Sequence, residues 1–511
     1  MFRNYIKIRF QKRDSFPLMG ILLAVGILYS GALRNKLVAD SWVFVYPHSF
    51  IETCAYFFTS IIPPEWKSLW LRPIPMFSFW FENKLFPGTS WLPHLTNIVF
   101  HLINVYLIWH IIRFASSARN EKKTLAYTGL PSLAACIFYG LHPLTVGSVA
   151  WVAARFDVMS ITCGLAGLLL WLKRDAGVPV RSGLWGISGL LLLSLLSKEQ
   201  GVVFIMVCFV ASLIRYFSGK GNRIEHFKTL IVLGISTGFY TLFRLLIFSG
   251  LGGYLTARHG FNLLIPFYYL AAMILPFSNS PPTYTISAVF LVSTALLGFI
   301  VFTMWNTSSK TKGKINWIFI LMAASIFIFG VVTTAPHAGL LLEQIVGHAE
   351  SRFALIPITG MSLLAGIVIH LFVENRTVHR IVLMFLLLLG SSYAWRTDAQ
   401  LQAWREAGLT ADSILQQTLK IAPNPSQGST LVFLDIPRNN DQYAYIFGIG
   451  LKEALQYLYG ERKDLAVIRY PKRGDLGKAK PERDFVFQYN KQTGTLEKLT
   501  GVRKKKDTGE Q

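Results

Sequence analysis

The chain has 511 residues, of which 52% are hydrophobic and 15% are charged, and its mean hydropathy is +0.42. Water-soluble domains rarely have this composition, so a soluble enzyme or binding module is excluded and a polytopic α-helical membrane protein is predicted. The net charge of +23 does not indicate nucleic-acid binding, because most of the excess Lys and Arg flanks apolar segments.

Eleven apolar segments approach the length that crosses roughly 30 Å of hydrocarbon. They lie at about 16–33, 93–112, 126–142, 150–172, 184–197, 201–217, 229–249, 284–305, 316–334, 353–373 and 380–395. A further segment, 263–280, is apolar but contains Pro266 and Pro276, and we interpret it as interfacial or re-entrant. Were it a span, the basic connection at 310–314 would face outward, against the charge bias.

Lys and Arg in the short connections predict the orientation of these spans. Alternate connections are basic, at 3–13, 113–123, 173–181, 215–228, 310–314 and 376–380, and are therefore placed in the cytoplasm together with the N-terminus. The other connections carry few positive charges and are placed at the outer face. That face would hold Asp40, His142, Asp157, Lys198, Arg258, Arg352 and everything after Arg396. We expect a bacterial inner-membrane protein whose first span is a retained anchor rather than a cleaved signal peptide.

The first outer loop, 34–92, is the longest connection between the early spans. Apolar residues from Ile51 to Ile62 recur at helical spacing, and aromatic residues crowd the stretch from Pro75 to Phe86. Both features are typical of segments lying in the headgroup layer. An ordinary aromatic belt is the alternative.

The chain becomes polar after Trp395. Residues 396–423 are predicted to form a helical stalk, followed by a small α/β domain at 424–502 outside the cytoplasm and a basic tail at 503–511. Within the domain we expect a strand at 430–435, a helix at 443–459, a strand at 465–470 and a hairpin at 492–494. The four cysteines are scattered and indicate neither a disulfide framework nor a zinc site.

Several short motifs of the membrane part resemble one known family. They are Arg72-Pro73-Ile74-Pro75, His94 to Asn97, His101 to Asn104, Leu141-His142-Pro143 through Trp151 to Arg155 and Asp157, Leu196-Ser197-Lys198-Glu199, and Glu350-Ser351-Arg352-Phe353 with Leu355-Ile356-Pro357. Together they resemble the membrane half of the transmembrane and tetratricopeptide-repeat O-mannosyltransferases and their bacterial relatives. The resemblance covers most of residues 15–405, and no tetratricopeptide repeat follows it.

This resemblance implies a GT-C glycosyltransferase, which takes a sugar from a polyprenyl-phosphate carrier and transfers it to an acceptor on the outer face. The family carries two adjacent acidic residues in its first outer loop, where this chain has Asp40-Ser41. One carboxylate suffices for a general base. An acidic pair that binds metal is not implied, so a divalent cation such as Mg²⁺ or Mn²⁺ stays optional, with Asp40 and Asp157 as candidate ligands.

Glycosyl transfer with inversion needs a carboxylate that accepts a proton and positive charge near the phosphate leaving group. Asp40 is the candidate catalytic base. The candidate substrate-binding residues are Arg72, His94, His142, Arg155, Asp157, Lys198, Glu199, Arg244 and Arg352. Arg244 lies inside an apolar run, where an arginine is costly unless it faces a partner or a cavity.

Each candidate also has a structural alternative. Asp40 could be a solvated loop acid or a helix N-cap, Asp157 could pair with Arg155, and Lys198 with Glu199 could form a solvated turn. The histidines could cap or pack at helix ends, and Arg352 could pair with Glu350.

Three functions remain open at this stage. The first is the polyprenyl-phosphate-dependent glycosyltransferase, with a glycan, lipid or protein acceptor. The second is an O-antigen ligase or polymerase, although such proteins carry their large outer loop late in the chain. The third is a non-catalytic membrane scaffold or transporter, but paired broken helices or an inverted repeat are not evident.

Overall fold

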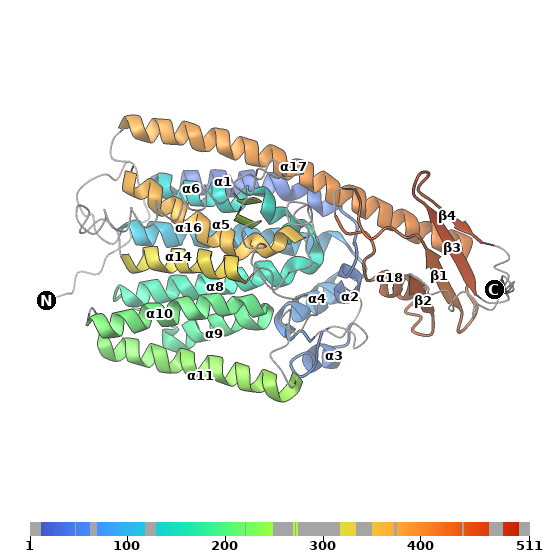
Figure 1. Ribbon diagram of the computed structural model, residues 1–511, viewed down its shortest axis with the longest axis horizontal. Helices are drawn as coiled ribbons and strands as arrows, with labels where there is room; N and C mark the ends of the chain where they lie inside the picture. The colour runs from blue at the N-terminus through green and yellow to red at the C-terminus, as the bar shows by residue number, and fades with distance from the viewer. Residues whose placement is uncertain are drawn as a thin grey trace, which may run out of the picture.

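The computed structural model describes residues 12–45, 48–61, 69–117, 129–219, 221–248, 269–270, 272–273, 317–333, 350–372, 376–441, 444–469 and 484–499. These residues form a bundle of long helices and a small α/β domain at one end of it (Figure 1). The bundle helices are α1 (Lys12–Ser30), α5 (Trp91–Ser117), α6 (Gly129–Gly140), α8 (Arg155–Asp175), α9 (Gly183–Ser197), α10 (Val202–Ser218), α11 (Arg223–Phe248), α14 (Trp317–Val332), α16 (Leu355–Phe372) and α17 (Arg376–Ile421).

Ten of the eleven predicted spans coincide with apolar helices. Among the described residues, seven helices are long and apolar enough to cross a membrane, and the bent pair Gly129–Gly140 and Pro143–Ala150 adds an eighth if it is one span. Two shorter apolar helices, Gly183–Ser197 and Trp317–Val332, match two further predicted spans. The segment 284–305 and most of 263–280 lie outside the described residues, so the number of crossings stays a prediction.

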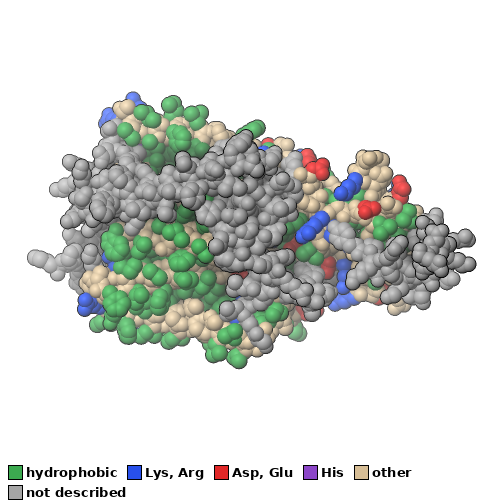
Figure 2. All heavy atoms as spheres, viewed as in Figure 1, with side chains coloured by type: hydrophobic (Ala, Val, Ile, Leu, Met, Phe, Trp, Pro, Cys, Tyr) green, Lys and Arg blue, Asp and Glu red, His purple; other side chains and the backbone are tan. Residues whose placement is uncertain are grey.

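Side chains on the outside of the bundle are largely apolar, as lipid contact requires (Figure 2). On α11, Ile235 is 65% exposed and Phe239 68% exposed, and on α17, Phe385 is 60% and Trp395 71% exposed. Charged side chains lie toward the α/β domain, and Lys and Arg also lie at the opposite end of the bundle (Figure 2). This division supports a membrane-embedded bundle with a domain outside the lipid.

Short helices close the end of the bundle that faces the α/β domain (Figure 1). They are α2 (Ser41–Val45), α3 (Phe50–Ala55), α4 (Pro73–Leu85), η3 (Pro143–Thr145), α7 (Val146–Ala150), η4 (Val152–Ala154), η5 (Glu199–Gly201) and η7 (Glu350–Ala354). In the first outer loop, Phe50 is 54% and Ile51 80% exposed, and Phe81 is 56% exposed. These exposed apolar groups suit either the headgroup-layer interpretation or an aromatic belt.

A buried polar face of α5 holds the broken chain between α6 and α8 in place. The Nδ2 group of Asn97 donates to the backbone oxygens of Val149 and Trp151, and the ring of His101 bonds the oxygen of Gly140 over 3.1 Å. Asn104 bonds the hydroxyl of Tyr139 over 3.1 Å. The break at Pro143 frees backbone groups from helical pairing, and these side chains satisfy some of them inside the protein.

The predicted last span and the predicted stalk are one uninterrupted helix. Helix α17 has 46 residues, from Arg376 to Ile421, so the expected separation between 380–395 and 398–421 is absent. No proline or glycine pair breaks the chain there, and the hydroxyl of Thr397 donates to the oxygen of Leu141 over 2.9 Å. The helix ends just before Pro423, as predicted. It therefore connects the bundle rigidly to the α/β domain.

The described residues of the C-terminal domain form a four-stranded sheet and one helix. Its strands are β1 (Thr430–Leu434), β2 (Ala466–Arg469), β3 (Phe485–Asn490) and β4 (Thr495–Lys498), and its helix is α18 (Leu451–Leu458). The sheet order is β2-β1-β3-β4, with β1 parallel to both neighbours and β3-β4 an antiparallel hairpin. The predicted small α/β domain is thus confirmed.

The domain's helix is shorter than predicted. We expected it at 443–459, but it begins at Leu451, directly after Gly450 with φ +88°. Residues Tyr445 and Asn439 form an isolated β-bridge instead of a first helical turn. The left-handed backbone at Gly450 prevents the helix from extending toward the N-terminus.

Candidate functional site

Asp40 lies in a buried position directly before α2. It retains only 6% of its exposure, and its Oδ1 atom has no hydrogen-bond partner within the described part of the chain. The preceding residue, Ala39, has φ +47°, a left-handed conformation that is unfavourable for alanine. A buried acceptor without a partner beside a strained residue is a feature of functional sites.

Burial raises the pKa of Asp40 to about 7. Desolvation is the main cause, since it disfavours the charged carboxylate, and the nearby Arg352 guanidinium offsets part of that rise. Glu350 raises the pKa further by like-charge repulsion. A carboxyl group tuned in this way accepts protons near neutral pH, whereas a solvated loop acid would not.

Arg352 and Glu350 lie on the short helix η7, and both act electrostatically on Asp40. Arg352 Nη2 lies 3.5 Å from Glu350 Oε2, and its guanidinium lies over the ring of Trp151, 4.4 Å from the centroid. The pairing of Arg352 with Glu350 that the sequence left open is therefore present. Glu350 also accepts a hydrogen bond from the hydroxyl of Tyr445, which belongs to the C-terminal domain.

Asp157 pairs with Lys198 rather than with Arg155. The Lys198 ammonium donates to Asp157 Oδ1, and the two side chains retain 2% and 6% of their exposure. The same ammonium lies 5.1 Å from the centroid of Phe353, next to Arg352. The interpretation of Lys198 as part of a solvated turn is wrong, because the side chain is buried.

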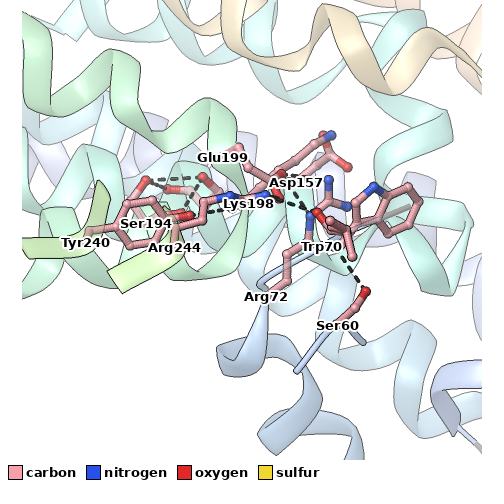
Figure 3. A network of polar contacts seen from close by, with 11 residues as sticks. Ser60, Trp70, Arg72, Asp157, Ser194, Lys198, Glu199, Tyr240 and Arg244 are labelled. Atoms are coloured by element: carbon pink, nitrogen blue, oxygen red, sulfur yellow. Dashed lines mark hydrogen bonds and ion pairs between the residues drawn. The ribbon is translucent and has the colours of Figure 1, made fainter. Parts of the chain in front are cut away.

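Glu199 joins two arginines from distant parts of the sequence (Figure 3). Arg72 Nη2 lies 2.7 Å from Glu199 Oε2, and Arg244 Nη2 lies 3.3 Å from Glu199 Oε1. Arg244 also donates to the hydroxyl of Tyr240 over 2.8 Å, but its buried Nε has no hydrogen-bond partner among the described residues. Arg244 lies in an apolar helix and was expected to face a partner, and its contacts with Glu199 and Tyr240 confirm this expectation.

The two ionic groups are neighbours. In Figure 3 the Asp157–Lys198 pair lies beside the Arg72–Glu199–Arg244 group, and both Arg72 and Arg352 act electrostatically on Lys198. The structure thus brings Asp40, Arg72, Asp157, Lys198, Glu199, Arg244 and Arg352 to one end of the bundle.

Arg155 is held by the chain itself. Its Nε donates to Asn97 Oδ1 over 3.0 Å, its Nη2 to the oxygen of Pro93 over 2.8 Å, and its Nη1 to Ser78 Oγ over 2.9 Å. Its Nη1 also lies 2.8 Å from Glu82 Oε2. This arrangement favours a role in fastening α4 to α5 and α8, and contact with substrate stays a prediction for Arg155.

His142 occupies a structural position, and contact of His94 with substrate stays a prediction. The Nδ1 atom of His142 accepts the N–H of Leu144 over 3.2 Å, which leaves Nε2 to donate to the oxygen of Met273 over 3.1 Å. His142 therefore caps η3 as a neutral ring. His94 is buried at the start of α5 near Ala150 and Arg155. Arg258 lies outside the described residues.

Within the described ranges, no three His, Cys, Asp or Glu side chains are grouped closely enough to hold a metal ion. A divalent cation bound with help from Asp40 or Asp157 stays a prediction.

Sequence reasoning missed the aromatic and backbone groups of the site. Trp151 was part of a motif but was not considered a site residue, and its ring stacks on Trp404 with centroids 5.8 Å apart. Tyr445 lies in the C-terminal domain, 405 positions after Asp40 in the numbering. No local pattern marks it, because only folding brings the two regions together.

Comparisons with known proteins agree with this fold. No family model matches the chain. The protein O-mannosyl-transferase Tmtc3 of Drosophila melanogaster is 30% identical over 173 residues, covering 30% of this chain and 19% of the relative. The protein O-mannosyl-transferase F38B6.6 of Caenorhabditis elegans is 23% identical over 357 residues, covering 65% of this chain and 47% of the relative. The chain spans less than half the length of these curated relatives.

A solved structure of similar fold is that of ArnT from Cupriavidus metallidurans bound to undecaprenyl phosphate. It superposes with a TM-score of 0.50 at 12% sequence identity, and the match covers 94% of this chain and 93% of ArnT. The resemblance to O-mannosyltransferases, which the motifs indicated, is confirmed by the sequence similarities, and ArnT shares the fold.

Proposed function

We propose that this chain is a membrane glycosyltransferase that transfers a sugar from a polyprenyl-phosphate donor to an acceptor on the outer face of the membrane. The observation that carries the proposal is Asp40, a buried carboxyl group whose pKa is raised to about 7 beside a gathering of arginine and lysine side chains. Bases and phosphate-binding cations are the two groups that such a transfer needs.

Asp40 is the general base in this proposal. Its carboxylate accepts the proton of the acceptor hydroxyl as that oxygen forms a bond to the anomeric carbon of the sugar. The bond from the anomeric carbon to the phosphate oxygen breaks on the opposite side, and polyprenyl phosphate leaves. Asp40 Oδ1 has no hydrogen-bond partner among the described residues, which leaves this oxygen able to accept from a substrate hydroxyl.

Arg72 and Arg244 are the proposed phosphate-binding residues. A guanidinium presents a planar fork of donors that suits phosphate oxygens, and the buried Nε of Arg244 has no hydrogen-bond partner among the described residues. Lys198 lies near both Arg72 and Arg352. In this proposal Lys198 and Arg352 add positive charge where the leaving phosphate gains negative charge. Asp157 and Glu199 hold these cations in place.

The names of the similar proteins support the proposal. Two relatives are protein O-mannosyl-transferases, and ArnT, which has a similar fold, was crystallised with undecaprenyl phosphate. We further propose an N-terminus in the cytoplasm and a C-terminal domain outside it, from the distribution of Lys and Arg in the loops. Glycan, lipid and protein acceptors remain alternatives, as do Mg²⁺ or Mn²⁺ as a cofactor.

Purified protein incubated with radiolabelled polyprenyl-phosphate sugars is expected to transfer label to an acceptor. Arg244→Gln should raise the donor concentration needed for half-maximal rate by roughly 10-fold or more, because a hydrogen bond to a charged group contributes about 1.5–3 kcal/mol. The matched control is Arg174→Gln, which removes an arginine from a pair with Glu225 at the far end of α8. That control should leave the donor requirement unchanged.

Three results would count against parts of the proposal. Absence of transfer from every polyprenyl-phosphate sugar would favour a scaffold or transporter. Transfer from a preassembled lipid-linked glycan alone would favour the ligase or polymerase alternative. An unchanged donor requirement in Arg244→Gln would remove that residue from the phosphate site.

The proposed base also predicts a pH dependence of turnover. The pKa of Asp40 is raised to about 7, so the carboxyl group is protonated and inactive below that pH and ionised above it. Turnover should therefore rise with pH through an inflection near 7, measured as kcat/KM for the donor. An inflection near the ordinary value of an aspartate, about 4, would contradict the raised pKa of Asp40.

A further inference from the structure

The C-terminal domain touches the backbone that carries Asp40. The N–H of Ala39 donates to the oxygen of Ile446 over 2.8 Å, which ties the residue before Asp40 to the loop that precedes α18. This hydrogen bond joins the first outer loop to the last domain of the chain. The loop formed by residues 444–450 is called the clamp loop below.

Gly450 packs directly against the peptide between Ala39 and Asp40. A Cβ atom built on Gly450 would lie 1.9 Å from the oxygen of Ala39 and 3.2 Å from the amide nitrogen of Asp40. Real Cβ atoms do not approach other heavy atoms to 1.9 Å, so only glycine fits here without moving the peptide between residues 39 and 40. The φ of +88° at this position also favours glycine.

The strain at Ala39 needs an external support. Its φ of +47° is unfavourable for an alanine, and such a conformation persists only where surrounding contacts determine it. The hydrogen bond that Ala39 donates to the oxygen of Ile446 and the close packing of Gly450 act on Ala39 from outside its own loop. Their combined effect fixes the direction in which the Asp40 side chain leaves the backbone.

A second contact joins the clamp loop to η7, the short helix that carries Glu350 and Arg352. The hydroxyl of Tyr445 donates to Glu350, and its ring lies 5.1 Å from that of Trp151 in an edge-to-face arrangement. Burial and the neighbouring Glu350 carboxylate raise the pKa of Tyr445 well above its usual value, so the phenol keeps its proton and donates. The clamp loop therefore spans from the segment that carries Asp40 to the helix that carries Arg352.

The clamp loop is itself held inside its domain. Arg469 on β2 donates to the oxygen of Gly448 over 2.7 Å and to that of Ile436 over 3.1 Å. The amide of Ile446 donates to the oxygen of Arg438 over 2.9 Å. The sheet thus supports the loop, and α17 supports the sheet from the bundle.

We propose that the clamp loop of the C-terminal domain is a positioning element of the catalytic centre, which holds Ala39 and thereby aims the Asp40 carboxylate at the acceptor. This inference rests on the proposed function. It assigns the small domain a part in the reaction, through Tyr445, Ile446 and Gly450, that the membrane part alone does not supply.

Gly450→Ala tests the contact, with Gly460→Ala as the matched control. Both glycines have positive φ, +88° and +81°, but a Cβ on Gly460 meets nothing within 4 Å. The backbone strain is therefore shared, and only Gly450→Ala collides with Ala39. Because a displacement of about 1 Å at a reacting group costs up to 10²-fold in rate, kcat should fall by roughly 10- to 100-fold in Gly450→Ala. The KM for donor should stay within about 3-fold, and Gly460→Ala should keep parental kcat.

Thiol labelling provides a readout that does not depend on activity. Asp40→Cys places a thiol in the buried position, and an impermeant thiol reagent should modify it slowly in the otherwise unchanged chain. Adding Gly450→Ala should increase the labelling rate several-fold, whereas adding Gly460→Ala should not. The same chain with Asp40 intact gives the background from the four natural cysteines.

The outcomes are distinct. Equal loss of kcat in the two glycine variants, or unchanged kcat and labelling in Gly450→Ala, would overturn the proposal. Increased labelling in Gly450→Ala in a protein that transfers no sugar would support the clamp contact while the proposed function fails.

Discussion

Asp40→Asn is expected to lower turnover by on the order of 10²-fold or more, the typical contribution of a general base. Asparagine keeps the size of the side chain and much of its hydrogen bonding, but it cannot accept the proton of the acceptor. Because Asp40 is buried and its pKa is raised to about 7, a neutral amide should fit this position and the protein should still fold. Initial rates with a radiolabelled donor, normalised to folded protein, measure the effect.

Asp398→Asn is a matched control for this substitution. Asp398 is exposed on α17 and accepts a hydrogen bond only locally, from Gln402 over 2.9 Å, so its amide variant should keep parental turnover. The residual activity of Asp40→Asn should also lose the inflection near pH 7. Activity of Asp40→Asn within a few-fold of the parent would remove this residue from catalysis.

Lys198→Met is expected to destabilise the protein by about 3–5 kcal/mol, because it leaves the buried Asp157 carboxylate without its cation. The two side chains retain 2% and 6% of their exposure, so water does not replace the lost partner. The double variant Lys198→Met with Asp157→Leu removes both charges and should recover most of the loss. Thermal unfolding in detergent compares the single and double variants.

Lys36→Met is the control for Lys198→Met, because it breaks an ion pair that is exposed to solvent. Lys36 lies 3.3 Å from Asp412, and the two side chains are 48% and 34% exposed, so losing this pair should cost less than about 1 kcal/mol. Equal melting temperatures for Lys198→Met and Lys36→Met would show that the Asp157–Lys198 pair is not buried in the folded protein. A double variant no more stable than Lys198→Met would mean that the loss comes from packing rather than from an uncompensated charge.

The amino-acid sequence by itself determined the membrane class, ten of the helices and the strands of the C-terminal domain. These features depend on interactions between neighbouring residues: apolar length decides whether a helix can span lipid, and Pro423 ends α17 wherever that helix lies. The sequence also identified Arg244 as a candidate, because a charge inside an apolar segment is costly unless it faces a partner or a cavity, whereas Asp40 and Lys198 were identified through the resemblance to a known family.

Only the tertiary structure decided which charged side chains pair and which distant segments are in contact. The motif that contains Arg155 and Asp157 suggested an ion pair between them, but both lie at the start of α8, where residues two apart point to different sides of the helix. Arg155 therefore reaches Glu82 on α4, and Asp157 reaches Lys198 beyond α9. The contact of Gly450 with Ala39 joins positions 411 apart in the numbering. No local pattern encodes such a contact, because it arises from the path of α17 and the packing of two separate regions of the chain.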